Sequence, residues 1–244
     1  DILNTPGVNT STIEDPIEYR MPRVNQTQVR ADIGLTFASG LRSLVRQDPD
    51  ILMVGEIRDA ETASLAINAA LTGHLVLSTL HTNSAAGALP RLLDMGQEAF
   101  LISSTVNIII AQRLVRKLCS DSWEKYKLKE QDINDIKKYV DLERVMSYLR
   151  ENKIVEKSTK FEDIEFYKQK PSKKCPDGYK GRIGIYEILE VTESIRALIT
   201  SHTTSDELHK QAVKEGMITM AEDGIIKAAQ RLTSIEEVLR VTRE

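Results

Sequence analysis

Three apolar runs of the sequence each end in side chains that suit nucleotide chemistry. In chain order, these end residues are Glu14 with Asp15, then Glu56, and finally His81. Carboxylates hold Mg²⁺ or orient the attacking water in phosphoryl transfer, and a histidine can hydrogen-bond a phosphate oxygen. Gly55, just before Glu56, allows the backbone and a phosphate to approach closely. The residue types therefore favour a Mg-nucleotide site.

The apolar runs are predicted to be strands that position these side chains. Runs 8–13, 51–54 and 75–80 alternate with segments of helical spacing that begin after Thr36 and Asp59. This order implies a parallel sheet with right-handed crossovers. Ligands bind at the carboxyl ends of the strands in such sheets. We therefore expect the strand-end acids and the histidine to meet at one edge.

The remaining segments complete an α/β prediction. Residues 17–33 are polar and are either a loop or a β-excursion, and residues 98–117 are predicted to be helical. Residues 120–170 are rich in Lys, Glu and Asp and have helical spacing, so we expect either an insertion packed on the outside or a partly mobile helical lobe. A strand at 185–189 precedes a region, 193–244, that is predicted to be helical throughout.

Composition is that of an ordinary globular protein. The chain has 244 residues, 41% hydrophobic and 28% charged, with a net charge of -3. That charge gives no argument for nucleic acid or an anionic membrane. The two cysteines fit a reducing compartment better than a disulfide scaffold. No apolar run approaches the ~18 residues of a membrane span. The start at Asp1 suggests a processed or truncated chain.

Each candidate also has a structural alternative. The acids before Pro16 can form a capped turn, Glu56 can form a surface ion pair with Arg58, and His81 can be a structural histidine. A phosphate cradle of the form G-x-x-x-x-G-K-[S/T] is not found in the sequence. The glycine-punctuated segment 178–182 is too short and precedes a strand, so it is not a P-loop.

Several longer segments resemble one family. They are STIEDPIEYR (11–20), RQDPDILMVGEIRD (46–59), TGHLVLSTLHTN (72–83), AQRLVRKLC (111–119) and GYKGR (178–182). The first three are similar to the aspartate box, Walker B segment and histidine box of the ATPases that power type II secretion and type IV pilus assembly. The resemblance implies a RecA-like P-loop NTPase core, incomplete at its N-terminus. It divides the chain into a partial core (1–118), an insertion (119–177) and a C-terminal region (178–244).

The resemblance also implies roles for individual residues. Glu14 is expected to be the catalytic carboxylate that positions or activates water, and Glu56 the Walker B acid acting on Mg²⁺ with ATP. The other residues expected at the nucleotide are Asp15, Arg58, His74 and His81. Family members form cytoplasmic hexamers that dock on a platform protein at the inner face of the cytoplasmic membrane. The expected partners are therefore other copies of the chain, the platform protein and ATP, without nucleic acid.

The family's phosphate cradle precedes the aspartate box, so the chain resembles the C-terminal part of the motor. We predict that these 244 residues alone neither bind ATP tightly nor hydrolyse it. A non-catalytic interaction or regulatory fragment of such a machine is the alternative. A nucleic-acid translocase is disfavoured by the charge.

The family's metal-binding lobe is degraded here. Assembly and secretion members usually hold zinc with two C-x-x-C pairs, but Ser122 and Ser172 stand where Cys119 and Cys175 would each have a partner. Two thiolates make half of a tetrahedral site. We predict free thiols and no structural zinc. Retention of the lobe favours the assembly or secretion branch over the retraction branch.

Overall fold

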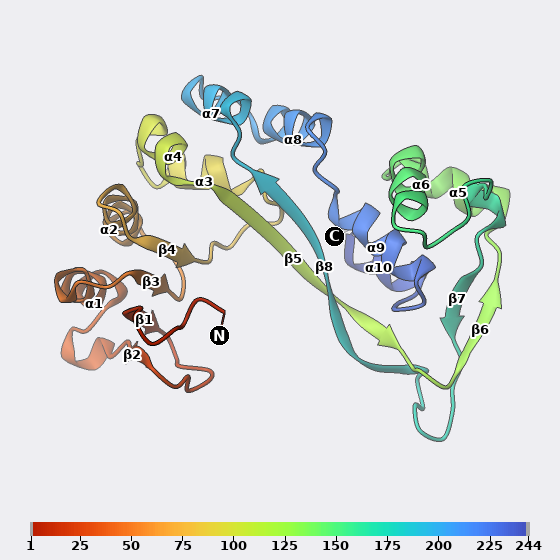
Figure 1. Ribbon diagram of the computed structural model, residues 1–244, viewed down its shortest axis with the longest axis horizontal. Coiled ribbons are helices and arrows are strands. Elements are labelled where there is room, and N and C mark those ends of the chain that lie inside the picture. Colours follow the sequence, from red (N-terminus) through yellow and green to blue (C-terminus); the bar gives the residue numbers. More distant parts are fainter. Residues whose placement is uncertain (1, 243–244) are drawn as a thin grey trace. The chain divides into compact units, whose positions relative to one another are not determined.

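A four-stranded, fully parallel sheet carries the strand ends identified in the sequence. In the computed structural model, which describes residues 2–242, its strand order is β2-β1-β3-β4 (Figure 1). The strands are β1 (Thr10–Glu14), β2 (Val24–Gln28), β3 (Ile51–Val54) and β4 (Leu75–Ser78). All neighbouring pairs run parallel, which confirms the predicted sheet. The polar segment 17–33 contains β2, so the β-excursion was the correct alternative.

Two capped helices connect the strands. Helix α1 (Phe37–Leu44) begins where the Thr36 side chain accepts a hydrogen bond from the Ser39 amide. Helix α2 (Ala60–Leu71) begins where Asp59 accepts one from the Thr62 amide. Such caps satisfy backbone donors that the first turn leaves unpaired. Both predicted helix starts are confirmed.

The prediction of one helix over residues 98–117 is wrong. Helix α4 (Ala99–Thr105) ends early and β5 (Ile108–Leu118) follows, paired with β8 (Tyr179–Glu190). Three consecutive isoleucines open β5, and β-branched side chains favour a strand over a helix. Its partner lies far away in the sequence, so local spacing did not reveal the pairing.

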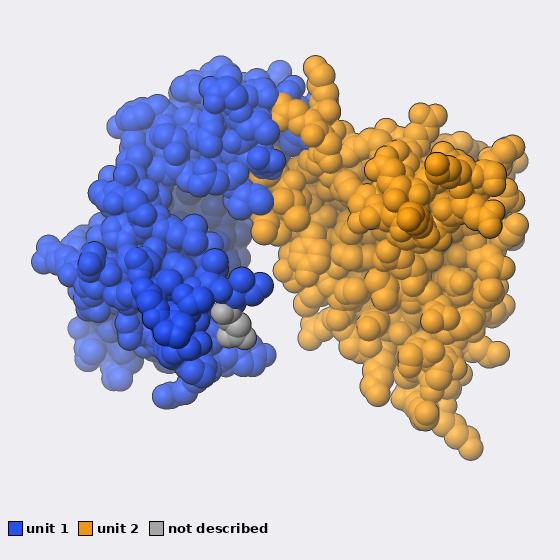
Figure 2. All heavy atoms as spheres, in the orientation of Figure 1, with its two compact units in different colours: residues 1–109, 190–212 blue, residues 110–189, 213–244 orange. Residues whose placement is uncertain are grey.

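The chain divides into two compact units (Figure 2). Unit 1 comprises residues 1–109 and 190–212, and unit 2 comprises residues 110–189 and 213–244. Unit 1 contains the parallel sheet with helices α1, α2 and α4, and it also contains α3 (Ala88–Asp94) and α7 (Glu193–Thr200). Arg196 of α7 donates to the carbonyl oxygen of Ser103 in α4. The three segments expected from the family resemblance remain a prediction.

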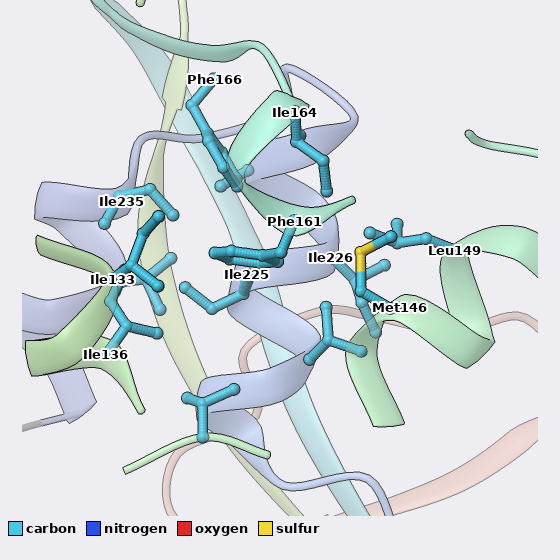
Figure 3. Close-up of a cluster of buried hydrophobic side chains, with 14 residues drawn as sticks. Ile133, Ile136, Met146, Leu149, Phe161, Ile164, Phe166, Ile225, Ile226 and Ile235 are labelled. Atoms are coloured by element: carbon cyan, nitrogen blue, oxygen red, sulfur yellow. The ribbon is translucent and has the colours of Figure 1, made fainter. Parts of the chain in front are cut away.

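Unit 2 contains the predicted insertion, which is not a purely helical lobe on the outside. Strands β6 (Trp123–Tyr126) and β7 (Phe166–Gln169) pair in antiparallel fashion, with α5 (Glu130–Ile136) and α6 (Leu142–Glu151) between them. Figure 3 shows Phe161 and Phe166 in one apolar cluster with isoleucines of α9 (Met220–Ala229) and α10 (Ile235–Thr242). The insertion shares its core with the C-terminal helices, and burial of such aromatic side chains stabilises that core.

Residues 193–242, after β8, form helices joined by short loops, in agreement with the prediction. These helices are α7, α8 (Ser205–Lys214), α9 and α10. Thr192 caps α7 and Thr219 caps α9, each by accepting a hydrogen bond from a first-turn amide.

Candidate functional site

The carboxyl ends of β1, β3 and β4 meet at one edge of the sheet. The Gly55 amide donates to the carbonyl oxygen of Ile13 at 2.8 Å, and the Ile57 amide donates to that of Thr79 at 3.0 Å. A Cβ atom at Gly55 would lie 3.2 Å from the Ile13 oxygen and 3.4 Å from the Glu14 Cα. Glycine thus lets the backbone at the end of β3 lie against that of β1. The structure brings Glu14 and Glu56 to adjacent strand ends.

Two hydroxyl groups, on the last residue of β4 and on the residue after it, complete the join between strand ends. Ser78 Oγ donates to the carbonyl oxygen of Val54 at 2.8 Å, and Thr79 Oγ1 donates to that of Gly55 at 2.7 Å. These bonds connect the end of β4 to the segment that carries Glu56. The segment that leads to His81 is therefore fixed beside the second carboxylate.

Glu56 is held by two basic side chains through one oxygen. Arg58 Nε donates to Glu56 Oε2 at 2.5 Å, and His81 Nε2 lies 2.8 Å from the same oxygen. The Glu56 side chain is 12% exposed, whereas those of Arg58 and His81 are mostly exposed. The hydrogen bond from Arg58, followed by that of His81, lowers the pKa of Glu56. The carboxylate is therefore kept ionised, as a metal ligand must be.

Glu14 is held in a similar way by two neutral donors. Thr12 Oγ1 donates to Glu14 Oε1 at 2.5 Å, and Gln26 Nε2 donates to the same atom at 3.0 Å. The residue is buried, with 8% of its surface exposed. Its other oxygen, Oε2, takes neither of these bonds. Each of the two strand-end carboxylates is thus fixed through one oxygen.

Asp15 acts electrostatically on Arg58, the arginine that holds Glu56. Glu56 raises the pKa of Arg58, mainly through their hydrogen bond, and Asp15 adds a smaller electrostatic contribution in the same direction. Asp15 is itself exposed at the end of β1. Arg58 and His81 contact Glu56 directly, and Asp15 affects this group only through its charge on Arg58.

His74 lies at the other end of β4. It precedes Leu75, the first residue of the strand, whereas His81 follows the last. Four strand residues span about 13 Å. Its Nδ1 atom lies 2.8 Å from the carbonyl oxygen of Ala69 and 3.2 Å from the hydroxyl of Thr72. The structure does not bring His74 to the strand ends that carry the carboxylates.

Thr12 and Gln26 were not identified from the sequence. Thr12 lies two residues before Glu14, so strand periodicity alone places both side chains on one face. Gln26 is the register partner of Thr12, and this relationship depends on β2, which the sequence did not resolve. Recognition of β2 as a strand parallel to β1 would have pointed to Gln26.

The cysteines are joined in unit 2, so the prediction of free thiols is wrong. Cys119 and Cys175 form a disulfide, with their Cα atoms 6.4 Å apart. Pairing of β6 with β7 brings the two ends of the insertion together, which sequence spacing did not show. The carboxylate of Asp121 lies within 4.8 Å of both sulfur atoms. Sulfurs joined to each other are not two zinc-binding thiolates. Absence of zinc remains a prediction.

No helix among residues 2–242 is long and apolar enough to cross a membrane.

The sequence and structure are similar to those of known secretion and pilus proteins. The chain is 47% identical over 242 residues to the type II secretion system protein E of Xanthomonas campestris pv. campestris, covering 99% of the chain and 40% of that protein. It is 44% identical over 244 residues to the type IV pilus assembly ATPase PilB of Pseudomonas aeruginosa, covering 100% of the chain and 40% of that protein. The chain thus spans about 40% of the length of these curated relatives.

The fold has a match among solved structures. The pilus retraction motor PilT with bound ADP aligns with a TM-score of 0.64 and 27% identity, over 97% of this chain and 53% of that one. The family model for the type II/IV secretion system protein matches residues 1–240. Together, the strand-end carboxylates and these similarities show that the chain belongs to the type II/IV secretion system protein family.

Proposed function

We propose that this chain supplies the magnesium-holding and water-activating residues of an ATPase that drives type IV pilus assembly or type II protein secretion. The pair of strand-end carboxylates carries the proposal: Glu14 and Glu56 lie on adjacent strands, and each is anchored through one oxygen. Relatives that are 44–47% identical are named as secretion and pilus-assembly proteins, which supports the choice of machine.

The two carboxylates have different partners, which suits different tasks. Glu56 lies between two basic groups and stays ionised, and carboxylate oxygen is a ligand that Mg²⁺ prefers. When bound with ATP, Mg²⁺ neutralises charge that develops on the phosphates. Glu14 has only neutral donors among its hydrogen bonds described above. It orients a water molecule and accepts its proton as the water oxygen bonds to the γ-phosphorus and the bond to the ADP oxygen breaks.

Basic residues beside Glu56 contact the nucleotide in this proposal. The side chains of Arg58 and His81 are 64% and 76% exposed, so both can reach a ligand while they hold Glu56. The negative charge of Asp15 favours the charged form of Arg58. His74 has no direct role in nucleotide binding, because its ring contacts the end of α2.

The full machine needs more than these residues. The remaining length of the protein supplies the phosphate cradle, and the complete motor is a cytoplasmic hexamer that docks on a platform protein at the inner face of the cytoplasmic membrane. Assembly and secretion are favoured over retraction because the named assembly and secretion relatives are 42–47% identical, against 27% for the retraction motor.

Steady-state ATP hydrolysis by the natural full-length protein that contains this chain tests the proposal. Glu14→Gln and Glu56→Gln should each lower kcat by about 100-fold or more. Glu61→Gln is the matched control, since Glu61 is an exposed acid in the first turn of α2. Wild-type rates in both site variants would refute the assignment of these residues, whereas a full-length wild-type protein that hydrolyses no ATP would favour a non-catalytic module.

A further inference from the structure

We propose that Gln26 is a positioning residue that orients the Glu14 carboxylate to accept the proton of the attacking water. This inference rests on the proposed function of Glu14. Gln26 Nε2 donates to Glu14 Oε1 at 3.0 Å. Within residues 2–242, the other side chain that donates to this carboxylate is Thr12, which lies on the same strand as Glu14. Gln26 is therefore the contact that comes from a neighbouring strand.

The amide of Gln26 joins Glu14 to the segment that connects β1 and β2. The same Nε2 donates to the carbonyl oxygen of Tyr19 at 2.9 Å, and Oε1 accepts a hydrogen bond from the Met21 amide at 2.8 Å. A side-chain amide has two N–H donors and a carbonyl oxygen, and these three contacts use both donors and engage the oxygen. The orientation of the amide is therefore fixed, with its donors directed at Glu14 and Tyr19.

The backbone holds Gln26 where this contact can form. Gln26 is the register partner of Thr12 in the parallel pair of β1 and β2, which extends over five residue pairs. Thr12 and Glu14 are two residues apart on a strand, so the three side chains share one face of the sheet. Gln26 is partly buried there, and its reach to Glu14 is set by regular strand pairing rather than by a loop.

Two donors on one oxygen fix the plane of the carboxylate. Thr12 and Gln26 both donate to Oε1, from different strands, so rotation of the carboxylate would break at least one bond. Removal of Gln26 leaves the carboxylate free to turn about the bond to Thr12. Misplacement of a reacting group by about 1 Å costs up to 100-fold in rate. We expect kcat to fall by about 10-fold, with little change in the KM for ATP.

The test uses ATP hydrolysis by the natural full-length protein that contains this chain. Gln26→Leu removes every hydrogen bond of the amide, whereas Gln26→Glu keeps an acceptor for the Met21 amide and loses the donor to Glu14. Gln47→Leu is the control, because Gln47 is an exposed residue of the same type that lies outside the sheet, whereas Gln28 is the register partner of Glu14 itself. Both Gln26 variants should lower kcat by about 10-fold with KM within about twofold, and the control should match wild type.

A double-mutant cycle shows whether Gln26 acts through Glu14. In single-turnover assays, Gln26→Leu should have little further effect when Glu14 is already glutamine. If either Gln26 variant has wild-type kcat while Glu14→Gln is inactive, the role proposed for Gln26 is overturned and the proposed function of Glu14 stands. A rate loss that persists in the Glu14→Gln background, or that matches a drop in thermal stability, would also overturn it. Full activity of Glu14→Gln would instead refute the proposed function, and this inference with it.

Discussion

His81 Nε2 lies 2.8 Å from Oε2 of Glu56, which joins the segment after β4 to the acid after β3. Thr79 Oγ1 also donates to the carbonyl oxygen of Gly55, so two contacts connect the same segments. A displacement of residues 79–81 would therefore move Glu56, the residue assigned to Mg²⁺. The arrangement couples the position of an exposed histidine to that of a metal ligand.

Replacement of His81 by asparagine is expected to affect catalysis more than stability. The variant loses the hydrogen bond that helps lower the pKa of Glu56, while Arg58 remains. Because His81 is 76% exposed, the free energy of unfolding should change by about 0.5 kcal/mol or less. ATP hydrolysis by the full-length protein should fall by about 10-fold. Equal activity of the variant and wild type would contradict the coupling.

Gly55→Ala is expected to destabilise the sheet edge and lower activity. The new methyl group would lie 3.2 Å from the Ile13 oxygen and 3.4 Å from the Glu14 Cα, so one strand end must shift. The expected loss in unfolding free energy is about 1–2 kcal/mol, measured by urea denaturation. Gly7→Ala is the control, because a Cβ there meets nothing within 4 Å. Indistinguishable unfolding midpoints for the two variants would show that the strand ends are not in close contact.

Glu237 should make the stability of unit 2 sensitive to acid. Its side chain is 2% exposed, and burial alone would raise its pKa. Hydrogen bonds from Arg240 and Arg116 more than offset burial and lower the pKa from 4.5 to about 2. A depressed carboxyl pKa stabilises the fold above the unfolded-state value. That contribution should be lost as pH falls from 4.5 to about 2.

The pH dependence of urea unfolding checks this expectation. Near neutral pH, the free energy of unfolding of Glu237→Gln should be lower than that of wild type by about 2–3 kcal/mol. This is the low end of the range for a broken buried ion pair, because Arg116 and Arg240 are half exposed to solvent. The difference should shrink as pH falls below 4.5. Glu236→Gln, an exposed neighbour on α10, is the control. A difference that stays constant from neutral pH down to about 2 would count against the assigned pKa.

Reduction of the disulfide should destabilise unit 2. Cys119 and Cys175 are 56 residues apart, so the cross-link restricts the unfolded chain over a long loop. Chain entropy predicts a loss of about 4 kcal/mol on reduction. Denaturation with and without a reductant measures it, and Cys119→Ser with Cys175→Ser should match the reduced protein. Two thiols that react with a thiol reagent in the unreduced, denatured protein would show that the bond is not formed. Elemental analysis of the same sample tests the predicted absence of zinc.

Patterns among neighbouring residues, such as an apolar run or a capping side chain, correctly predict the strands and helices that depend on them. Strand β3 is a continuous apolar run, and α1 and α2 begin at side-chain caps, so their starts were correct. The sequence points to Glu14, Glu56 and His81 because each lies at or just after the carboxyl end of an apolar run. Their convergence followed from the rule that ligands bind at the carboxyl ends of parallel strands.

Features that depend on distant pairing were missed. The sequence predicts a helix in place of strand β5 because the partner strand β8 is remote in the sequence. Gln26 was missed because β2 is polar and has no apolar alternation, and its role depends on register with Thr12. The disulfide depends on the pairing of β6 and β7. In each case the decisive contact joins residues that no local pattern relates.

A single-turnover experiment on the Glu14→Gln variant of the full-length protein is the sharpest test of the catalytic role of Glu14. With radiolabelled ATP and Mg²⁺, nucleotide affinity and the rate of phosphate formation are measured on the same sample. We expect near wild-type affinity and hydrolysis slower by about 100-fold or more, since only the water-activating group is removed. Hydrolysis within about twofold of wild type would contradict the assignment of Glu14 as the catalytic carboxylate.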